Sequence, residues 1–148
     1  MKEENNIKVL DEVNKGCAMG MDSLKDILDK AEGKKFKETL ERHYGKYEKI
    51  SERIKDLYDE YSESNPQETN AMEKTMTWYG IQMRTMTDNS TSKLAELLMQ
   101  GTNMGIIEGR KILNHKDVDK DVKSIVEEFV KMQEKNVEEL KEFLWKYK

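Results

Sequence analysis

Residues 34–63 read KKFKETLERHYGKYEKISERIKDLYDEYSE. Apolar, aromatic and a few polar side chains recur at alternating steps of three and four residues, so they share one face of an α-helix. The members of this stripe are Phe36, Leu40, His43, Tyr47, Ile50, Ile54, Leu57 and Tyr61. Most of the other positions carry Lys, Arg, Glu or Asp, which suits a solvent face. The stretch therefore predicts a long amphipathic helix that buries one stripe against other helices.

The same spacing recurs on both sides of this segment. It predicts further helices over residues 6–31, 66–87, 90–114 and about 118–147. Helix stop and start signals separate these segments: Gly33 after the first, and Asn65 with Pro66 at the start of the third. Ser90 or Ser92 begins the fourth segment, and Asp117 or Asp119 caps the last one.

These segments predict an all-α fold. The sequence has eight Gly and one Pro, too few turn residues for an all-β protein. Two long hairpins, 6–63 and 90–147, are joined by a segment long enough to run the height of a bundle. We expect a ferritin-like four-helix bundle of two hairpins with a helical crossover, forming a single domain over residues 1–148. An extended five-helix assembly is the alternative.

Composition excludes several classes of protein. Lys and Arg total 26 against 30 Asp and Glu, with the signs interspersed, so no basic stripe is present to bind nucleic acid. No window approaches the ~20 apolar residues of a membrane span. The one cysteine, Cys17, cannot form an internal disulfide. The N-terminus opens acidic and polar rather than as a signal peptide. We therefore expect a cytoplasmic protein that binds neither nucleic acid nor membrane.

Interior glycines form a repeated pattern in two of the predicted helices. Gly16 and Gly20 lie in the first, and Gly101, Gly105 and Gly109 lie in the fourth. Glycine costs about 1 kcal/mol relative to alanine inside a helix, so a compensating contact is expected. Because small residues at this spacing let two backbones approach closely, we expect the first and fourth helices to cross at these glycines. The shared Gly-x-x-Met-Gly also suggests that the hairpins are related halves.

Several short motifs resemble landmarks of a bacterial ferritin-like family of unknown function. They are Gly16-Cys-Ala-Met-Gly-Met-Asp, Trp78-Tyr79-Gly80, Gln100-Gly101-x-x-x-Gly-Ile-Ile-Glu108, and Gln133 in the last helix. The resemblance extends over most of the chain. It implies a four-helix bundle of ferritin-like architecture, but no activity. Relatives in the wider superfamily that act as ferritins or oxidases hold two metal ions between their helices.

The stripes do not carry the ligands of such a metal centre. A di-iron carboxylate site takes one Glu from each of two helices and Glu-x-x-His from each of the other two. The corresponding core pairs here are Leu40-x-x-His43 and Gln133-x-x-Asn136. We therefore expect no functional di-iron centre, no cofactor and no catalytic residue, with these polar groups fixing helix pairing instead. The alternative is a reduced site for iron or another divalent metal that uses His43, Glu108 and Gln133.

Methionines gather in the predicted crossover. Met72, Met76, Met83 and Met86 share one face of residues 66–87. Such a stripe could hold Cu(I), but no His or Cys lies in the segment to complete a soft site. A crossover packs on the outside of a bundle, so Met72, Met76, Trp78 and Met83 are candidates for contact with a second copy or a protein partner.

Three functions follow as hypotheses. The first is an interaction or stress-related structural module that self-associates and is more consistent with a non-enzyme. The second is a metal-binding oxidoreductase or metal-storage protein with a reduced ligand set. The third is a binder of a small apolar molecule between loosely packed, Met-rich helices. Cys17 lies on a core stripe and is expected to be an inert thiol, although a Cys17–His43 pair is conceivable.

Overall fold

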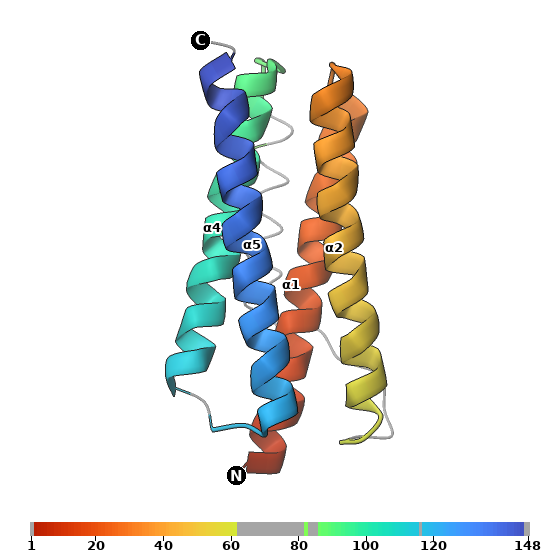
Figure 1. Ribbon diagram of the computed structural model, residues 1–148, viewed down its shortest axis with the longest axis vertical. Helices are drawn as coiled ribbons and strands as arrows, with labels where there is room; N and C mark the ends of the chain where they lie inside the picture. The colour runs from red at the N-terminus through yellow and green to blue at the C-terminus, as the bar shows by residue number, and fades with distance from the viewer. Residues whose placement is uncertain (1, 62–81, 83–85, 116, 147–148) are drawn as a thin grey trace.

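The computed structural model describes residues 2–61, 82, 86–115 and 117–146 (Figure 1). This part of the chain is helical and contains four long helices: α1 (Lys2–Lys30), α2 (Lys34–Tyr58), α4 (Thr91–His115) and α5 (Lys120–Lys146). They pack together as a bundle, as the stripes predict. The third predicted segment, 66–87, lies almost entirely outside the described residues, and so do Met72, Met76, Trp78 and Met83.

The helices run along the long axis of the bundle (Figure 1). Helix α1 rises from the N-terminal end, α2 returns, α4 descends from the opposite end and α5 rises beside it. Contacts are most extensive within the pairs α1–α2 and α4–α5, and less extensive between them. The fold is therefore two helical hairpins that share one interior.

Several helix ends follow the sequence signals, but α1 begins at Lys2 rather than at residue 6, and α2 ends at Tyr58 rather than at residue 63. Gly33 separates α1 from α2 and adopts φ 92°, a backbone conformation that residues other than glycine rarely adopt. The Ser90 side chain accepts a hydrogen bond from the backbone N–H of Lys93 at 3.3 Å, so Ser90 caps α4. The backbone carbonyl of Asp119 accepts the N–H of Lys123 at 2.9 Å, which places Asp119 at the start of α5. These caps settle the two boundaries for which the sequence offers two candidates each.

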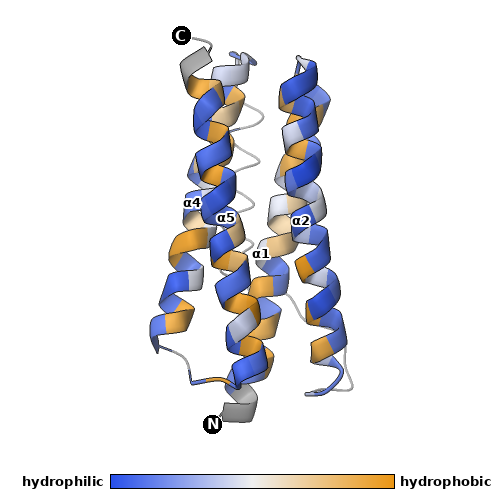
Figure 2. Cartoon of the chain, in the orientation of Figure 1, coloured by the Kyte–Doolittle hydropathy of each residue, from blue (hydrophilic) through white to orange (hydrophobic). Residues whose placement is uncertain are grey.

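The core runs the length of the bundle between the inward stripes. Leu10, Leu40, Leu94 and Leu140 contribute one fully buried leucine from each helix. The outward faces are predominantly hydrophilic, and hydrophobic positions lie toward neighbouring helices (Figure 2). None of the described helices has an apolar stretch sufficient to cross a membrane.

Contacts between α2 and α5 fix the register of the two hairpins. The rings of Phe36 and Phe143 pack with centroids 4.9 Å apart, and the hydroxyl of Tyr61 donates to Asp119 at 2.9 Å. An ion pair between Arg53 and Glu128 lies between these contacts along the helices. Partners on α5 move toward its start as positions on α2 advance, so the two helices are antiparallel neighbours.

Candidate functional site

The prediction that α1 and α4 pack against each other at their glycines is wrong, because these glycines face side chains of other helices. A Cβ atom on Gly16 would lie 2.7 Å from the Phe129 ring, and one on Gly20 would lie 2.6 Å from the Tyr47 ring. On α4, a Cβ on Gly105 would lie 2.1 Å from Oε1 of Gln133. The nearest neighbours of these glycines are therefore side chains of α2 and α5. The spacing correctly indicates close approach, but it does not say which helix approaches.

A cavity of about 290 Å³ lies where these glycines face the interior. All five interior glycines of α1 and α4 line it, and most of its other described lining is apolar. Met19 and Met104 contribute from the same two helices, while Tyr47 and Phe129 contribute aromatic rings from α2 and α5. Their ring centroids are 6.3 Å apart in an edge-to-face arrangement. The volume is at the lower end of the ~300–1,000 Å³ typical of small-molecule pockets.

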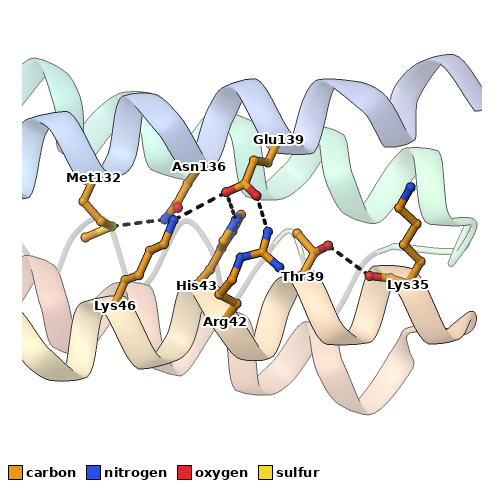
Figure 3. Close-up of polar contacts among 8 residues, drawn as sticks. All are labelled: Lys35, Thr39, Arg42, His43, Lys46, Met132, Asn136 and Glu139. Carbon is orange, nitrogen blue, oxygen red and sulfur yellow. Dashed lines mark hydrogen bonds and ion pairs between the residues drawn. The ribbon is translucent and has the colours of Figure 1, made fainter.

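Polar side chains from α2 and α5 form part of the cavity wall. Gln133 and Asn136 are 2% and 1% exposed and stand one turn apart on the same face of α5. The hydroxyl of Tyr47 donates to Oε1 of Gln133 at 3.3 Å. The Nδ2 atom of Asn136 donates to the sulfur of Met132 at 3.1 Å, a weak acceptor (Figure 3).

Two atoms of this polar group lack hydrogen-bond partners. Within the described part of the chain, Nε2 of Gln133 and Oδ1 of Asn136 are buried without a partner. A buried polar atom left unsatisfied costs about 1–3 kcal/mol, and such atoms are uncommon in folded proteins. The cavity wall therefore presents one unused donor and one unused acceptor.

His43 lies beside this group and contacts Glu139. Its Nε2 atom lies 3.2 Å from Oε1 of Glu139, which also accepts from Lys46 at 3.4 Å and pairs with Arg42 (Figure 3). Burial lowers the pKa of His43 to about 4, although Glu139 opposes that change. The imidazole is therefore neutral near neutral pH, and its Nε2–H donates to the carboxylate. Burial raises the pKa of Glu139, but hydrogen bonds from Arg42 and His43 outweigh it and leave that pKa lowered.

The three residues considered for a reduced metal site line the same cavity but do not converge as ligands. His43 and Gln133 lie in its wall, whereas the Glu108 side chain is 56% exposed and lies 3.6 Å from Lys111. A metal ligand at Glu108 requires this side chain to face the core, but Gly109 occupies the buried position instead. Among the residues described, no three His, Cys, Asp or Glu side chains are grouped to hold a metal ion. This donor set does not fit a di-iron centre.

Cys17 is fully buried, in agreement with the expectation of a core thiol. Burial raises the pKa of its thiol well above the usual range, which suppresses the nucleophilic thiolate. The imidazole of His43 is directed to Glu139 and not to Cys17. The arrangement does not provide an activated nucleophile at this position.

Sequence reasoning missed Glu139, the carboxylate that organises the cationic side chains around His43. A signal was available, because Glu139 follows Asn136 by one turn and Arg42 and Lys46 flank His43. This signal could be interpreted only with the knowledge that α2 and α5 are neighbours.

Comparison with protein-family models, with curated proteins and with solved structures finds no match to this chain. The resemblance to a ferritin-like family therefore stays a prediction from short motifs.

Proposed function

We propose that this protein binds a small, largely apolar molecule in the cavity between its two hairpins. The observation that carries the proposal is the pair of unpartnered atoms, Nε2 of Gln133 and Oδ1 of Asn136, in the wall of a 290 Å³ cavity. A ligand that reaches both atoms removes their desolvation penalty, and its apolar body gains from burial.

The interior glycines support the same function. Each glycine costs about 1 kcal/mol in a helix, so their retention requires a structural reason. Gly16 and Gly20 leave room for the rings of Phe129 and Tyr47 against α1, while Gly105 leaves room for Gln133 against α4. Side chains at these positions would displace the groups that shape the cavity. The glycines thus keep both the walls and the space between them in place.

Water is the ordinary occupant of a polar cavity. A buried water molecule typically makes about three hydrogen bonds, so water would cluster near Gln133 and Asn136. The apolar remainder, lined by groups such as Leu98, Met104 and Ile112, offers water no partners. An apolar molecule suits that part of the cavity better.

The ferritin-like architecture remains part of this proposal. It is supported by the end of α2 and the start of α4 lying at opposite ends of the bundle, as a lengthwise crossover requires (Figure 1). A role as an interaction module rests on Met72, Met76, Trp78 and Met83, which lie outside the described residues. That role, and self-association with it, stays a prediction from the sequence.

Calorimetric titration with naphthalene tests the binding function. We expect one molecule to bind per chain with a dissociation constant on the order of 10 μM. Met104→Trp places a larger side chain in the cavity wall and should weaken binding at least about tenfold. Asn103→Trp, at the exposed neighbouring position, is the matched control and should bind as the parent protein does.

A second pair of variants probes the cavity from the other hairpin. Met19→Trp should also weaken binding, and Ala18→Trp at the adjacent exposed position should not. Circular dichroism verifies that each variant is folded. Absence of naphthalene binding by the parent protein, or unchanged binding by both filled variants, would contradict the proposal.

A further inference from the structure

The residues that line the cavity include one donor atom and one acceptor atom without hydrogen-bond partners. Gln133 and Asn136 each engage one end of their amide: Oε1 of Gln133 accepts from Tyr47, and Nδ2 of Asn136 donates to Met132. What remains is the amide nitrogen of Gln133, with its two N–H bonds, and a carbonyl oxygen on Asn136. Because the two residues are one turn apart on α5 and both line the cavity, their side chains share one part of its wall.

The charges around the cavity disfavour an anionic ligand. No Lys or Arg is among the described residues that line it, and its acidic lining residues are Glu12 and Glu108. His43 offers no positive charge, because burial lowers its pKa to about 4. Among the described residues of this site, a carboxylate would lose its hydration without meeting a cation.

A cationic head group is also a poor match for the polar side chains of the cavity wall. The free group on Gln133 is an N–H donor, which faces a positive ammonium unfavourably. The carboxylate beside His43, Glu139, is already engaged by Arg42, His43 and Lys46. An uncharged group that both accepts and donates satisfies the two free atoms together.

We propose, building on the binding function above, that the cavity selects ligands with an uncharged head group that accepts a hydrogen bond from Gln133 and donates one to Asn136. Primary amides and alcohols on a compact apolar body are the chemical classes that meet this requirement. The rings of Tyr47 and Phe129 in the wall favour a planar body, since aromatic surfaces pack well edge to face.

Three naphthalene derivatives of closely similar shape separate head-group recognition from cavity filling. 2-Naphthamide supplies the acceptor and the donor, 2-naphthoate is its charged isostere, and naphthalene lacks a head group. We expect 2-naphthamide to bind about tenfold more tightly than naphthalene, and 2-naphthoate to bind more weakly than either. Calorimetry at neutral pH gives the three dissociation constants.

Asn136→Leu keeps the size of the side chain and removes its free acceptor. In this variant the amide should lose its advantage over naphthalene, so that the two compounds bind with similar dissociation constants. Asn103→Leu on the exposed face of α4 is the matched control and should retain the preference. Gln133→Met removes the free donor instead and provides an independent second test by the same readout.

The outcomes distinguish the two proposals. If naphthalene binds and the amide binds no better, or if Asn136→Leu and Gln133→Met both keep the preference, the head-group inference is overturned while the cavity proposal stands. Tighter binding of 2-naphthoate would also overturn it. If none of the three compounds binds, the proposed binding function itself fails.

Discussion

The imidazole of His43 is 1% exposed, and its burial determines how it responds to pH. Its neighbours are the carboxylate of Glu139 and the cationic groups of Arg42 and Lys46 on its own helix. Glu139 favours the imidazolium form and the two cations oppose it, but desolvation is the largest effect. The pKa of His43 is therefore about 4 in the folded protein, below its ordinary value in an unfolded chain.

This difference predicts that His43 makes the folded state less stable in mild acid. The unfolded chain takes up a proton near the ordinary histidine pKa of about 6.5, whereas the folded protein does so only near 4. Stability is fully present above the higher value and falls as pH decreases between the two. Lowering pH from about 7 to about 5 should cost about 2 kcal/mol through this residue alone.

Urea denaturation of His43→Gln at the two pH values tests this prediction. The variant should lose less stability than the parent protein over the interval. Glu139 does not affect the comparison. Its carboxyl group has a lowered pKa, so its contribution to stability is lost only at a pH below this interval. His115→Gln, at the exposed end of α4, is the control and should behave as the parent does. Equal losses in the parent and His43→Gln would refute the prediction.

The unpartnered amide of Asn136 leads to a second prediction at this scale. Asn136→Leu should raise the free energy of unfolding of the unligated protein by about 1 kcal/mol, because it removes a buried acceptor that has no donor. The gain would come with loss of head-group recognition, a trade-off common at binding sites. Chemical denaturation measures it, with Asn103→Leu expected to change stability little. A marked decrease in stability would show that the Asn136 oxygen has a stabilising role in the empty cavity.

At the scale of single helices, sequence patterns predict the four described helices and the breaks between them, but they miss the start of α1 and the end of α2 by several residues. The stripe of α5 from Val122 to Phe143 is buried throughout, and the breaks at Gly33 and Ser90 lie where local chemistry places them. These features depend on helical periodicity and on capping, which involve residues close in the chain. These features can therefore be predicted without knowledge of the tertiary structure.

The same patterns are weaker at the edge of a stripe. Glu108 and Gly109 both continue the spacing of α4, but the burial of Gly109 and the exposure of Glu108 depend on Val130 of the neighbouring helix. Likewise, Leu57 was placed in the core, whereas Tyr58 is the more deeply buried of the two. Steps of three and four both reach the inner face, so only the neighbouring helix decides between adjacent residues.

The glycines of two helices give a prediction with an internal control. Gly20→Ala would bring a methyl group within 2.6 Å of the Tyr47 ring, so the ring must move and the protein should lose about 1–3 kcal/mol of stability. Gly45→Ala in α2 meets nothing within 4 Å and should gain up to about 1 kcal/mol from helix propensity alone. Thermal unfolding followed by circular dichroism measures both. Similar effects of the two substitutions would mean that Gly20 is not required for the placement of Tyr47.

At the scale of the whole molecule, the site arises where the two hairpins meet. His43 and Tyr47 come from one hairpin, and Gln133 and Asn136 come from the other. Glycines of both hairpins also line the cavity. The sequence singled out His43, Gln133 and Asn136 as core polar residues. It could not show that they border a cavity, because the space depends on how far apart the two hairpins pack.

The dependence of the cavity on both hairpins predicts a link between ligand binding and access to Cys17. This thiol is fully exposed to reagents only after the bundle opens, since it is buried and its raised pKa suppresses the thiolate. Alkylation by iodoacetamide, followed by mass spectrometry, should therefore be slow in the folded protein and should accelerate with urea. Naphthalene at about ten times its dissociation constant should slow it roughly tenfold, if the opening that exposes Cys17 also dismantles the cavity.

Met104→Trp supplies the control for that linkage. In the filled variant, whose dissociation constant is at least about tenfold higher, the same naphthalene concentration should slow alkylation by about twofold at most, which excludes a direct effect of naphthalene on the reagent. An unchanged rate in the parent protein would mean that α1 exposes Cys17 by a local opening that leaves the cavity intact. The expected slowing follows because Gly16 and Gly20, on either side of Cys17 in the chain, both line the cavity. A movement of α1 large enough to expose the thiol therefore removes one wall of the binding site.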